Sequence, residues 1–355
     1  MNAAIRTAPG AALALASAAL FGASTPLAKL LLGSVDPWLL AGLLYLGSGI
    51  GLALLHGGRI AIRVPPTEAP LRRADLPWLT AVVLCGGGIG PVLLMVGLAH
   101  TEASSAALLL NLEGVATIAI ARVAFGEDVD RRILLGASAI LAGALLLSWK
   151  SPVVGIGWGA FAIAGACVAW GIDNNLTRKL SSADPVHIAI TKGIVAGAVN
   201  LAIALAKGAA MPAPGATLGA GMVGFFGYGV SLVLFVLALR HLGTARTGAY
   251  FSAAPFIGAA LAITIFDEPI TTRLILAATL IGIGVYLHLT ERHAHQHAHK
   301  AAEHEHRHVH DKHHQHVHGD NDPPGEPHVH LHRHVPMIHG HRHFPDIHHP
   351  HRHAT

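Results

Sequence analysis

The chain has 355 residues, of which 52% are hydrophobic and only 12% are charged. A soluble domain is usually about a quarter charged, so these values exclude an ordinary soluble fold and indicate that lipid covers most of the surface. The net charge of +4 does not point to nucleic acid, because the basic residues lie in short segments between apolar runs, as in membrane proteins.

Ten apolar runs follow one another along the chain. Most are close to the ~20 residues that a helix needs to cross a bilayer, and backbone groups in lipid need partners within their own segment. The sequence therefore predicts an all-α integral membrane protein with about ten transmembrane helices. The first run is too long for the core of a signal peptide, so we expect a retained span. The runs are residues 10–32, 37–55, 77–98, 104–123, 132–149, 155–177, 185–206, 217–240, 247–266 and 272–290.

The basic residues predict the orientation. With the N-terminus inside, twelve Lys and Arg residues lie at the inner ends of the spans and four at the outer ends, as the positive-inside rule requires. Ten spans return the C-terminus to the same side. We therefore expect a multi-pass protein of the cytoplasmic (inner) membrane with both termini in the cytoplasm.

The chain repeats itself. A shift of 141 residues aligns His100 with His241, Phe125 with Phe266 and Gly143 with Gly284. Each half then holds five spans, and an odd number forces the second copy to insert upside down, as in many secondary transporters. The expected units are a first five-helix repeat (1–149), a second five-helix repeat (150–290) and a tail (291–355).

Three short motifs resemble the EamA family of the drug/metabolite transporter superfamily, and the resemblance covers about residues 10–290. This resemblance implies a ten-helix exporter or exchanger of small metabolites, without naming the solute. The family often has a glutamate followed by proline where Glu113 stands. Here Gly114 follows, and the second repeat has Ala254-Pro255 instead. The motifs are Asn111-Leu112-Glu113-Gly114, Gly126-Glu127 and Asp267-Glu268-Pro269.

Glu113 lies near the middle of the fourth span, with Thr117 one turn further along the same helix face. A charge at that depth costs roughly 2.5–3.5 kcal/mol on insertion scales. Glu113 is therefore either a carboxylate that couples transport to a proton or to substrate, or a structural group bonded between helices. Asn111, in the same motif, is a further candidate.

The sixth span ends in a polar cluster that follows Trp170, namely Asp173, Asn174 and Asn175. Three consecutive polar side chains cannot all face lipid, so some must face the bundle. Lys192 lies at a similar depth in the seventh span, which predicts an Asp173–Lys192 ion pair. Such a pair serves either as a gate or substrate ligand, or only as a structural contact.

Glycines interrupt the third span at residues 86–90 and recur in the eighth. They fit either a flexible helix beside a cavity or close helix packing, and no phosphate-binding loop is expected. Cys85 and Cys167 are expected to be small buried residues, and His100, His187, His241 and His288 to be polar residues near span ends.

After Thr290 the composition changes, and 23 of the 28 histidines lie in the tail. Its composition predicts disorder. Neutral imidazole binds Zn²⁺, Ni²⁺, Co²⁺ and Cu²⁺, and alternate residues of an extended chain can share an ion. Two alternatives for the tail are a passive tract without a function and a segment that binds anionic lipid in a pH-dependent way. The candidate ligands are His293, His295, His297, His299, His304, His306, His308, His310, His328, His330, His332 and His334.

Together these features predict a secondary transporter of a small metabolite by alternating access, with a metal-binding tail. A transporter of divalent metal ions and a non-transporting metal buffer or sensor are the alternatives. No enzyme constellation stands at one membrane depth, and no cofactor is required beyond the metal bound by the tail. The expected partners are the bilayer, a small solute and divalent metal ions, with a homodimer left open and no nucleic acid.

Overall fold

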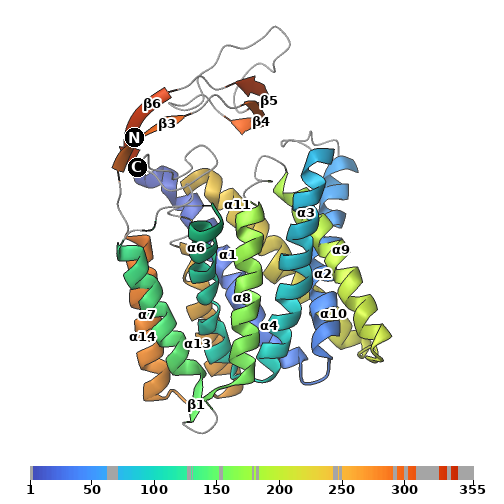
Figure 1. The fold of residues 1–355 in the computed structure, drawn as a ribbon. Helices are drawn as coiled ribbons and strands as arrows, with labels where there is room; N and C mark the ends of the chain where they lie inside the picture. The colour runs from blue at the N-terminus through green and yellow to red at the C-terminus, as the bar shows by residue number, and fades with distance from the viewer. Residues whose placement is uncertain are drawn as a thin grey trace.

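The computed structural model describes residues 3–61, 71–125, 129, 131–151, 155–177, 180, 184–242, 247 and 250–290. In the tail it describes residues 294–299, 303–308, 328–333 and 337–342. The body is a bundle of helices that run roughly side by side, and short strands lie beyond one end of it (Figure 1).

The helices of the first half follow the predicted spans. Two of these spans, the third and the fourth, are made of more than one helical piece, and a short antiparallel pair of strands closes this half. The elements are α1 (Ala3–Leu31), α2 (Pro37–Ala61), η1 (Arg73–Asp75), α3 (Leu76–Val82), η2 (Val83–Ile89), α4 (Gly90–Ala99), α5 (Ala103–Leu109), α6 (Leu112–Phe125), α7 (Arg131–Ser148), β1 (Trp149–Ser151) and β2 (Gly155–Ile156).

The second half has the same plan. Its elements are α8 (Trp158–Thr177), α9 (Pro185–Ala206), α10 (Pro214–Gly224), η4 (Phe225–Val230), α11 (Ser231–Leu242), α13 (Ala254–Phe266) and α14 (Thr272–Leu289). The tail strands are β3 (Ala294–His299), β4 (Glu303–His308), β5 (His328–Arg333) and β6 (Met337–Arg342).

Eight helical segments of the described residues are long and apolar enough to cross a membrane, where the sequence predicted ten. The sixth expected span, α8, is not among them because Asp173, Asn174 and Asn175 make its end polar. The ninth is reduced to α13, which has 13 residues and would span only about 20 Å. Both helices nevertheless lie within the bundle beside the others (Figure 1).

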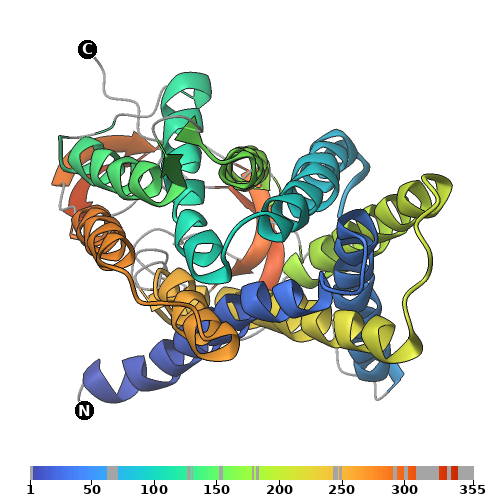
Figure 2. The same cartoon turned by 90° about the horizontal axis from the view of Figure 1, so that it is seen from below.

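Two pairs of helices form opposite edges of the bundle. Seen from below, α7 and α14 lie side by side at one edge, and α2 and α9 at the other (Figure 2). Glycines allow the close approach, since a Cβ on Gly49 would meet the backbone of Gly193 at 2.8 Å. Small residues at such contacts are typical of membrane helices.

The interior between these edges is apolar and tightly filled. Its main cluster joins α2, α4 and α8 through side chains that include Leu40, Met95 and Ile163, each essentially without exposed surface. The outer surface is also apolar, with Val123 86% and Leu54 72% exposed. Water would not favour such a surface, so the structure fits a helical body surrounded by lipid.

The bundle has two ends that matter for the site. The tail face is the end at which α14 stops, together with the ends of α2, α6 and α8 and the starts of α7 and α9 (Figure 1). A hydrogen bond from Arg132 at the start of α7 to the carbonyl of Thr290 (2.9 Å) ties this face together. The far face carries the ends of α1 and α4 and the β1–β2 pair. Since α1 also starts on the tail face (Figure 1), both ends of the helical body lie on one side.

The described parts of the tail differ from the disorder that the sequence predicted. Strand β3 pairs with β6, and β4 pairs with β5, both antiparallel. The physical reason lies in the same alternation of histidine with other residues, because a period of two matches the geometry of a strand.

Candidate functional site

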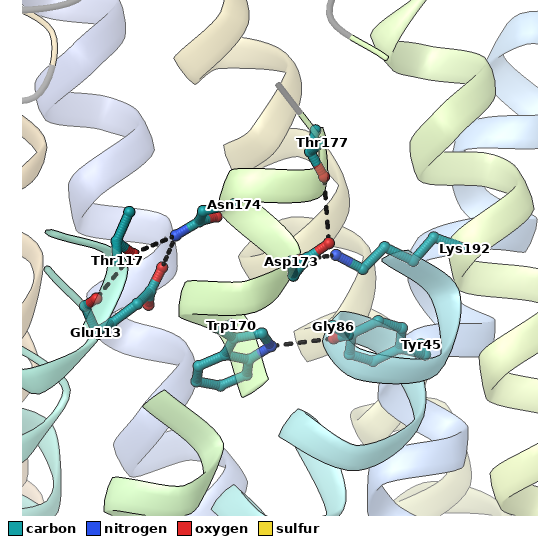
Figure 3. Close-up of polar contacts among 9 residues, drawn as sticks. All are labelled: Tyr45, Gly86, Glu113, Thr117, Trp170, Asp173, Asn174, Thr177 and Lys192. Carbon is teal, nitrogen blue, oxygen red and sulfur yellow. Dashed lines mark hydrogen bonds and ion pairs between the residues drawn. The ribbon is translucent and has the colours of Figure 1, made fainter. Parts of the chain in front are cut away.

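Polar side chains from four helices meet inside the bundle, in its tail-facing half. They come from α2, α6, α8 and α9, and they surround the backbone of the glycine segment η2 (Figure 3). Asp173 lies four residues before the end of α8, roughly 6 Å along the helix. The site therefore lies below the end of the bundle, at a depth where charged groups need partners or water.

Glu113 and Asn174 join α6 to α8. The amide Nδ2 of Asn174 donates to Oε1 of Glu113 (2.8 Å) and to Oγ1 of Thr117 (3.3 Å) (Figure 3). The hydroxyl of Thr117 donates to the backbone carbonyl of Glu113 at 2.8 Å. The partners of the Glu113 side chain are thus neutral groups, and the Asn174 side chain is exposed rather than packed away.

Asn175 and Asn111, near this contact, form hydrogen bonds to backbone carbonyls. Nδ2 of Asn175 donates to the carbonyls of Thr117 (3.0 Å) and Gly171 (2.8 Å), which fixes α8 against α6. Asn111 lies at the interruption between α5 and α6 and donates to the carbonyl of Leu108 (2.9 Å). The structure therefore places Asn111 in a local bond at the interruption between α5 and α6, two residues before Glu113.

Asp173 and Lys192 form the ion pair expected from the sequence (Figure 3). Their side chains are 7% and 18% exposed, so little water screens the attraction. The hydroxyl of Thr177 also donates to Oδ1 of Asp173 (3.2 Å). Removing either charge would leave the other buried without its partner, which typically costs 3–5 kcal/mol.

The glycine segment η2 is wound more widely than an α-helix, as single-turn π segments at functional sites often are. Such a segment leaves carbonyls that need other donors. The hydroxyl of Tyr45 (2.7 Å) and Nε1 of Trp170 (3.0 Å) both donate to the carbonyl of Gly86 (Figure 3). Nδ2 of Asn200 donates to the carbonyl of Gly87 at 3.1 Å.

The ion pair lies directly on this backbone. A Cβ on Gly86 would collide with the carboxylate of Asp173 and the ammonium of Lys192. The glycine run therefore has a specific reason, which is to let a helix backbone touch a buried pair of charges. The sequence left two interpretations open for these glycines, a flexible helix beside a cavity or close packing. At Gly86 the structure shows close packing, and the groups packed against it are the charges of Asp173 and Lys192.

A row of aromatic rings leads from the site across the bundle. The ring centroid of Tyr45 lies 5.6 Å from that of Tyr228, which lies 5.9 Å from Phe21, which in turn lies 5.5 Å from Phe251. These distances are typical of favourable ring contacts. The row connects α2, η4 and α1 to the residues before α13.

On the far face, two charged residues clamp the helix ends. Nζ of Lys29 donates to the carbonyls of Leu98 and, at 2.9 Å, Thr101. The carboxylate of Glu268 accepts from the amides of Ala103 (2.7 Å) and Ser104 (3.0 Å). These bonds hold α1 and the end of α13 against the turn between α4 and α5.

Asp267, which precedes Glu268, has a left-handed backbone with φ of 51°. A residue with a side chain rarely adopts this conformation, and the surrounding contacts must hold it there. The Asp267-Glu268 motif therefore ends α13 and aims the Glu268 carboxylate at the start of α5.

A histidine pair lies on the tail face between α2 and α9. Nε2 of His56 and Nε2 of His187 are 3.1 Å apart, and Nδ1 of His187 is 3.7 Å from the carboxylate of Asp184. Among the residues whose side chains the structure describes, no group of three or more His, Cys, Asp or Glu residues is arranged to hold a metal ion.

The structure thus brings together Glu113, Thr117, Asn174 and Asn175 in one contact, and Asp173, Lys192 and Trp170 in another. Sequence reasoning missed Tyr45, Asn200 and Tyr228, which supply donors and rings from other helices. The sequence did offer a signal for Tyr45 and Asn200, because each places a polar side chain inside an apolar span, Tyr45 in α2 and Asn200 in α9. Other expected residues lie outside the described residues, namely Gly126, Glu127, His293, His310 and His334.

An apolar helical body with a buried charged site defines a polytopic membrane protein of the transporter class, and comparison with known proteins agrees. The profile of the EamA-like transporter family matches residues 8–149 and 157–290. The chain therefore belongs to the EamA-like transporter family.

One relative and one solved structure are also similar to this chain. An uncharacterized transporter of Methanothermobacter thermautotrophicus (strain ATCC 29096 / DSM 1053 / JCM 10044 / NBRC 100330 / Delta H) is 29% identical over 281 residues, which cover 75% of this chain and 82% of the relative. A solved crystal structure is similar with a TM-score of 0.57 and 18% identity, covering 81% of this chain and 97% of the other. The latter likeness concerns the fold alone.

Proposed function

We propose that this protein is a secondary transporter, an exporter or exchanger, that carries a small metabolite across the cytoplasmic membrane by alternating access. The observation that carries the proposal is the Asp173–Lys192 ion pair, which is held against an irregular glycine segment inside an apolar bundle. Ionisable groups at such depth are costly and usually mark a transport pathway. Irregular backbone inside a membrane bundle is tolerated where protein or a wet cavity surrounds it.

The packing of the helices supports two inverted five-helix repeats, residues 1–149 and 150–290. Helix α1 packs against α11 and α13, while its counterpart α8 packs against α4 and α6, which are the counterparts of α11 and α13. Between α7 and α14, Gly143 faces Ile281 and Gly284 faces Ile140. The 141-residue shift maps the first of these contacts onto the second.

The irregular segments also recur in both halves. η2 and η4 occupy equivalent places in the third and eighth spans. The turn between α5 and α6 has its equivalent just before α13, so that Ala254 at the start of α13 corresponds to Glu113. Interrupted helices in both members of a repeat are typical of the substrate region of secondary transporters.

Within this mechanism, Glu113 couples solute movement to a proton or contacts the solute itself. Its side chain meets only neutral donors among the described residues, so its charge is free to change with loading of the site. Asp173 and Lys192 act as an internal gate, because their contact joins α8 to α9 and a movement of one helix relative to the other would break it. The side chains of Glu113, Asp173 and Lys192 are positioned by their neighbours. These neighbours are Thr117, Asn174, Asn175, Asn111 and Trp170.

The tail adds a second role in the proposal, the binding of divalent metal ions on the cytoplasmic side. The same histidines support two alternatives, a transporter of divalent metal ions and a non-transporting metal buffer or sensor. The described membrane body offers no three-residue metal cluster, whereas a site that strips water from a metal ion needs several ligands. The organic solute is therefore favoured for the body, and the metal is assigned to the tail.

Transport assays in proteoliposomes separate these roles. We would compare the full chain with a variant lacking residues 291–355, using a panel of small organic solutes together with Zn²⁺, Ni²⁺ and Co²⁺. The proposal expects an organic solute to cross with both proteins, while metal is only bound and only when the tail is present. Metal that crosses the bilayer without the tail would make the membrane body a metal transporter. Loss of every phenotype with the tail would indicate a buffer or sensor.

A further inference from the structure

Two histidines face each other across the contact between α2 and α9, apart from the buried charges of the transport site. Nε2 of His56 and Nε2 of His187 are 3.1 Å apart, and the two rings meet edge to face with their centroids 4.6 Å apart. Neutral imidazole is the commonest side-chain ligand of transition metals. Two imidazole nitrogens that converge on one point are therefore the beginning of a metal site.

The distance between the two nitrogens fits a shared metal ion. Zn²⁺–N bonds of about 2.0–2.1 Å in a tetrahedral arrangement place two nitrogens roughly 3.3–3.4 Å apart. The same bond lengths at the right angle of a square-planar site, which Cu²⁺ and Ni²⁺ prefer, place them roughly 2.8–3.0 Å apart. The observed 3.1 Å lies between these values, so a small rotation of the rings is enough to hold an ion.

Close packing of the two helices keeps the histidines in place. Gly49 of α2 and Gly193 of α9 bring the two backbones into contact. His56 follows Gly49 by seven residues, about two turns, which puts it on the same side of α2. His187 precedes Gly193 by six residues in α9. Because the helices touch at the glycines, the two ligands are already positioned before an ion arrives, which lowers the cost of binding.

Asp184 orients one of these ligands. Its Oδ1 accepts a hydrogen bond from the amide of Val186 (2.8 Å), which fixes the carboxylate at the start of α9. Its Oδ2 lies 3.7 Å from Nδ1 of His187. A carboxylate beside one ring nitrogen favours the tautomer that carries its proton there, which leaves the lone pair of Nε2 for a metal. Histidines that bind metals almost always have such a partner.

The pair is open to water at the end of the bundle. His187 is the third residue of α9, His56 lies five residues before the end of α2, and the side chain of His187 is 40% exposed. The described side chains form no group of three or more possible metal ligands, so water fills the remaining positions around an ion held here. Such an ion enters and leaves from the tail face without crossing the bundle.

We propose that His56 and His187 bind a divalent transition-metal ion of the Zn²⁺ type on the tail face, with Asp184 as a positioning residue. The ion joins the first half of the chain to the second, since α2 belongs to one half and α9 to the other. The site is separate from the transport site and from any metal bound by the tail. A simple hydrogen bond between the two rings is the alternative account of this contact, and it predicts no response to metal.

The test measures unfolding of the full chain in mixed micelles, with the concentration of free Zn²⁺ set by a chelating buffer. An ion that binds only the folded body stabilises it according to its concentration. H56Q and H187Q are the test variants, because glutamine can still donate and accept a hydrogen bond but is no imidazole. H100Q is the control, since it removes an exposed histidine on the far face.

A further variant, D184N, separates positioning from ligation. Asparagine caps a helix as well as aspartate does, so this change removes the charge beside His187 and keeps the start of α9. Its expected effect is a weaker zinc site in a protein that is equally stable without zinc. An unchanged zinc dependence of D184N would overturn the positioning role of Asp184.

Above the Kd, each tenfold increase in free Zn²⁺ should raise the folding equilibrium constant of the wild type and of H100Q about tenfold. H56Q and H187Q should lose this rise, and D184N should need roughly 10–100-fold more free Zn²⁺ for the same rise. An equal rise in every variant would show that zinc acts at another place, such as the tail. No rise in the wild type would leave only the hydrogen bond. Either of these results would overturn the site, while the transport proposal would stand.

Discussion

Replacing Gly86 by alanine tests the connection between the glycine segment and the buried ion pair. The added Cβ would occupy the space of the Asp173 carboxylate and the Lys192 ammonium. The two charges would have to separate, or η2 would have to move and lose the bonds from Tyr45 and Trp170 to the Gly86 carbonyl. Gly88 provides the matched control, because a Cβ there meets only the carbonyl of Val83, at an ordinary 3.7 Å.

The size of the effect follows from these contacts. Overpacking a filled interior costs about 1–3 kcal/mol, and breaking a buried ion pair costs about 3–5 kcal/mol. Since the pair can relax partly, we expect a loss of about 3 kcal/mol for Gly86→Ala, which corresponds to roughly a hundredfold change in the folding equilibrium. Gly88→Ala should be neutral, or more stable by up to about 1 kcal/mol, because alanine favours a helix over glycine.

Equilibrium unfolding in mixed micelles, with increasing mole fraction of a denaturing detergent, measures this difference. The two variants should unfold at clearly separated midpoints, with Gly86→Ala the less stable. Equal midpoints would show that the ion pair does not depend on the bare backbone at position 86, and the argument for the glycine run would be wrong.

Three further substitutions probe the charged groups. Lys192→Ala should lower expression and activity, and Asp173→Ala in the same chain should restore part of both, since an unpaired buried charge is the main cost; no rescue would count against the pair. Glu113→Gln should insert normally but lose the pH dependence of uptake, and an unchanged pH profile would remove Glu113 from coupling. Glu268→Gln, between α13 and α14, should cost about 1–2 kcal/mol in the unfolding assay by weakening two bonds to backbone amides, whereas Glu102→Gln, in the turn between α4 and α5 that Glu268 contacts, should have little effect.

Sequence reasoning found the helices because membrane spans leave a strong pattern. A bilayer requires about 20 apolar residues per helix, whatever the neighbours, so the positions of α1, α2, α7 and α14 follow from hydropathy. It counted α8 as a span although Asp173, Asn174 and Asn175 make the end of this helix polar. It could not show that the ninth span is reduced to the 13-residue α13, because that depends on where the folded backbone interrupts the helix.

The site was predicted in part for a similar reason. A charge inside an apolar span needs a partner, and that rule, together with their similar depth in the sixth and seventh spans, joined Asp173 to Lys192. The rule does not say which neutral groups surround a site, so Tyr45 and Asn200 could not be selected from many other polar residues. Their role depends on the carbonyls that η2 leaves for donors from other helices, which is a property of the folded backbone.

For the tail, composition and periodicity led to different expectations. Composition predicted disorder, while the alternation of histidines carried the period of a strand. Which histidines face one another depends on register, and register cannot be read from a repetitive sequence because many alignments look alike. Only the backbone pairing distinguishes His306 opposite His330 from the other combinations.

The most direct test of the transporter proposal is solute uptake by proteoliposomes that contain the full chain, with an imposed pH gradient and Glu113→Gln as the comparison. We predict that at least one small organic solute accumulates, that the gradient drives its accumulation, and that Glu113→Gln removes the dependence on the gradient. If folded protein moves no organic solute across the bilayer and carries only divalent metal ions, the assignment of the membrane body to metabolite transport is wrong.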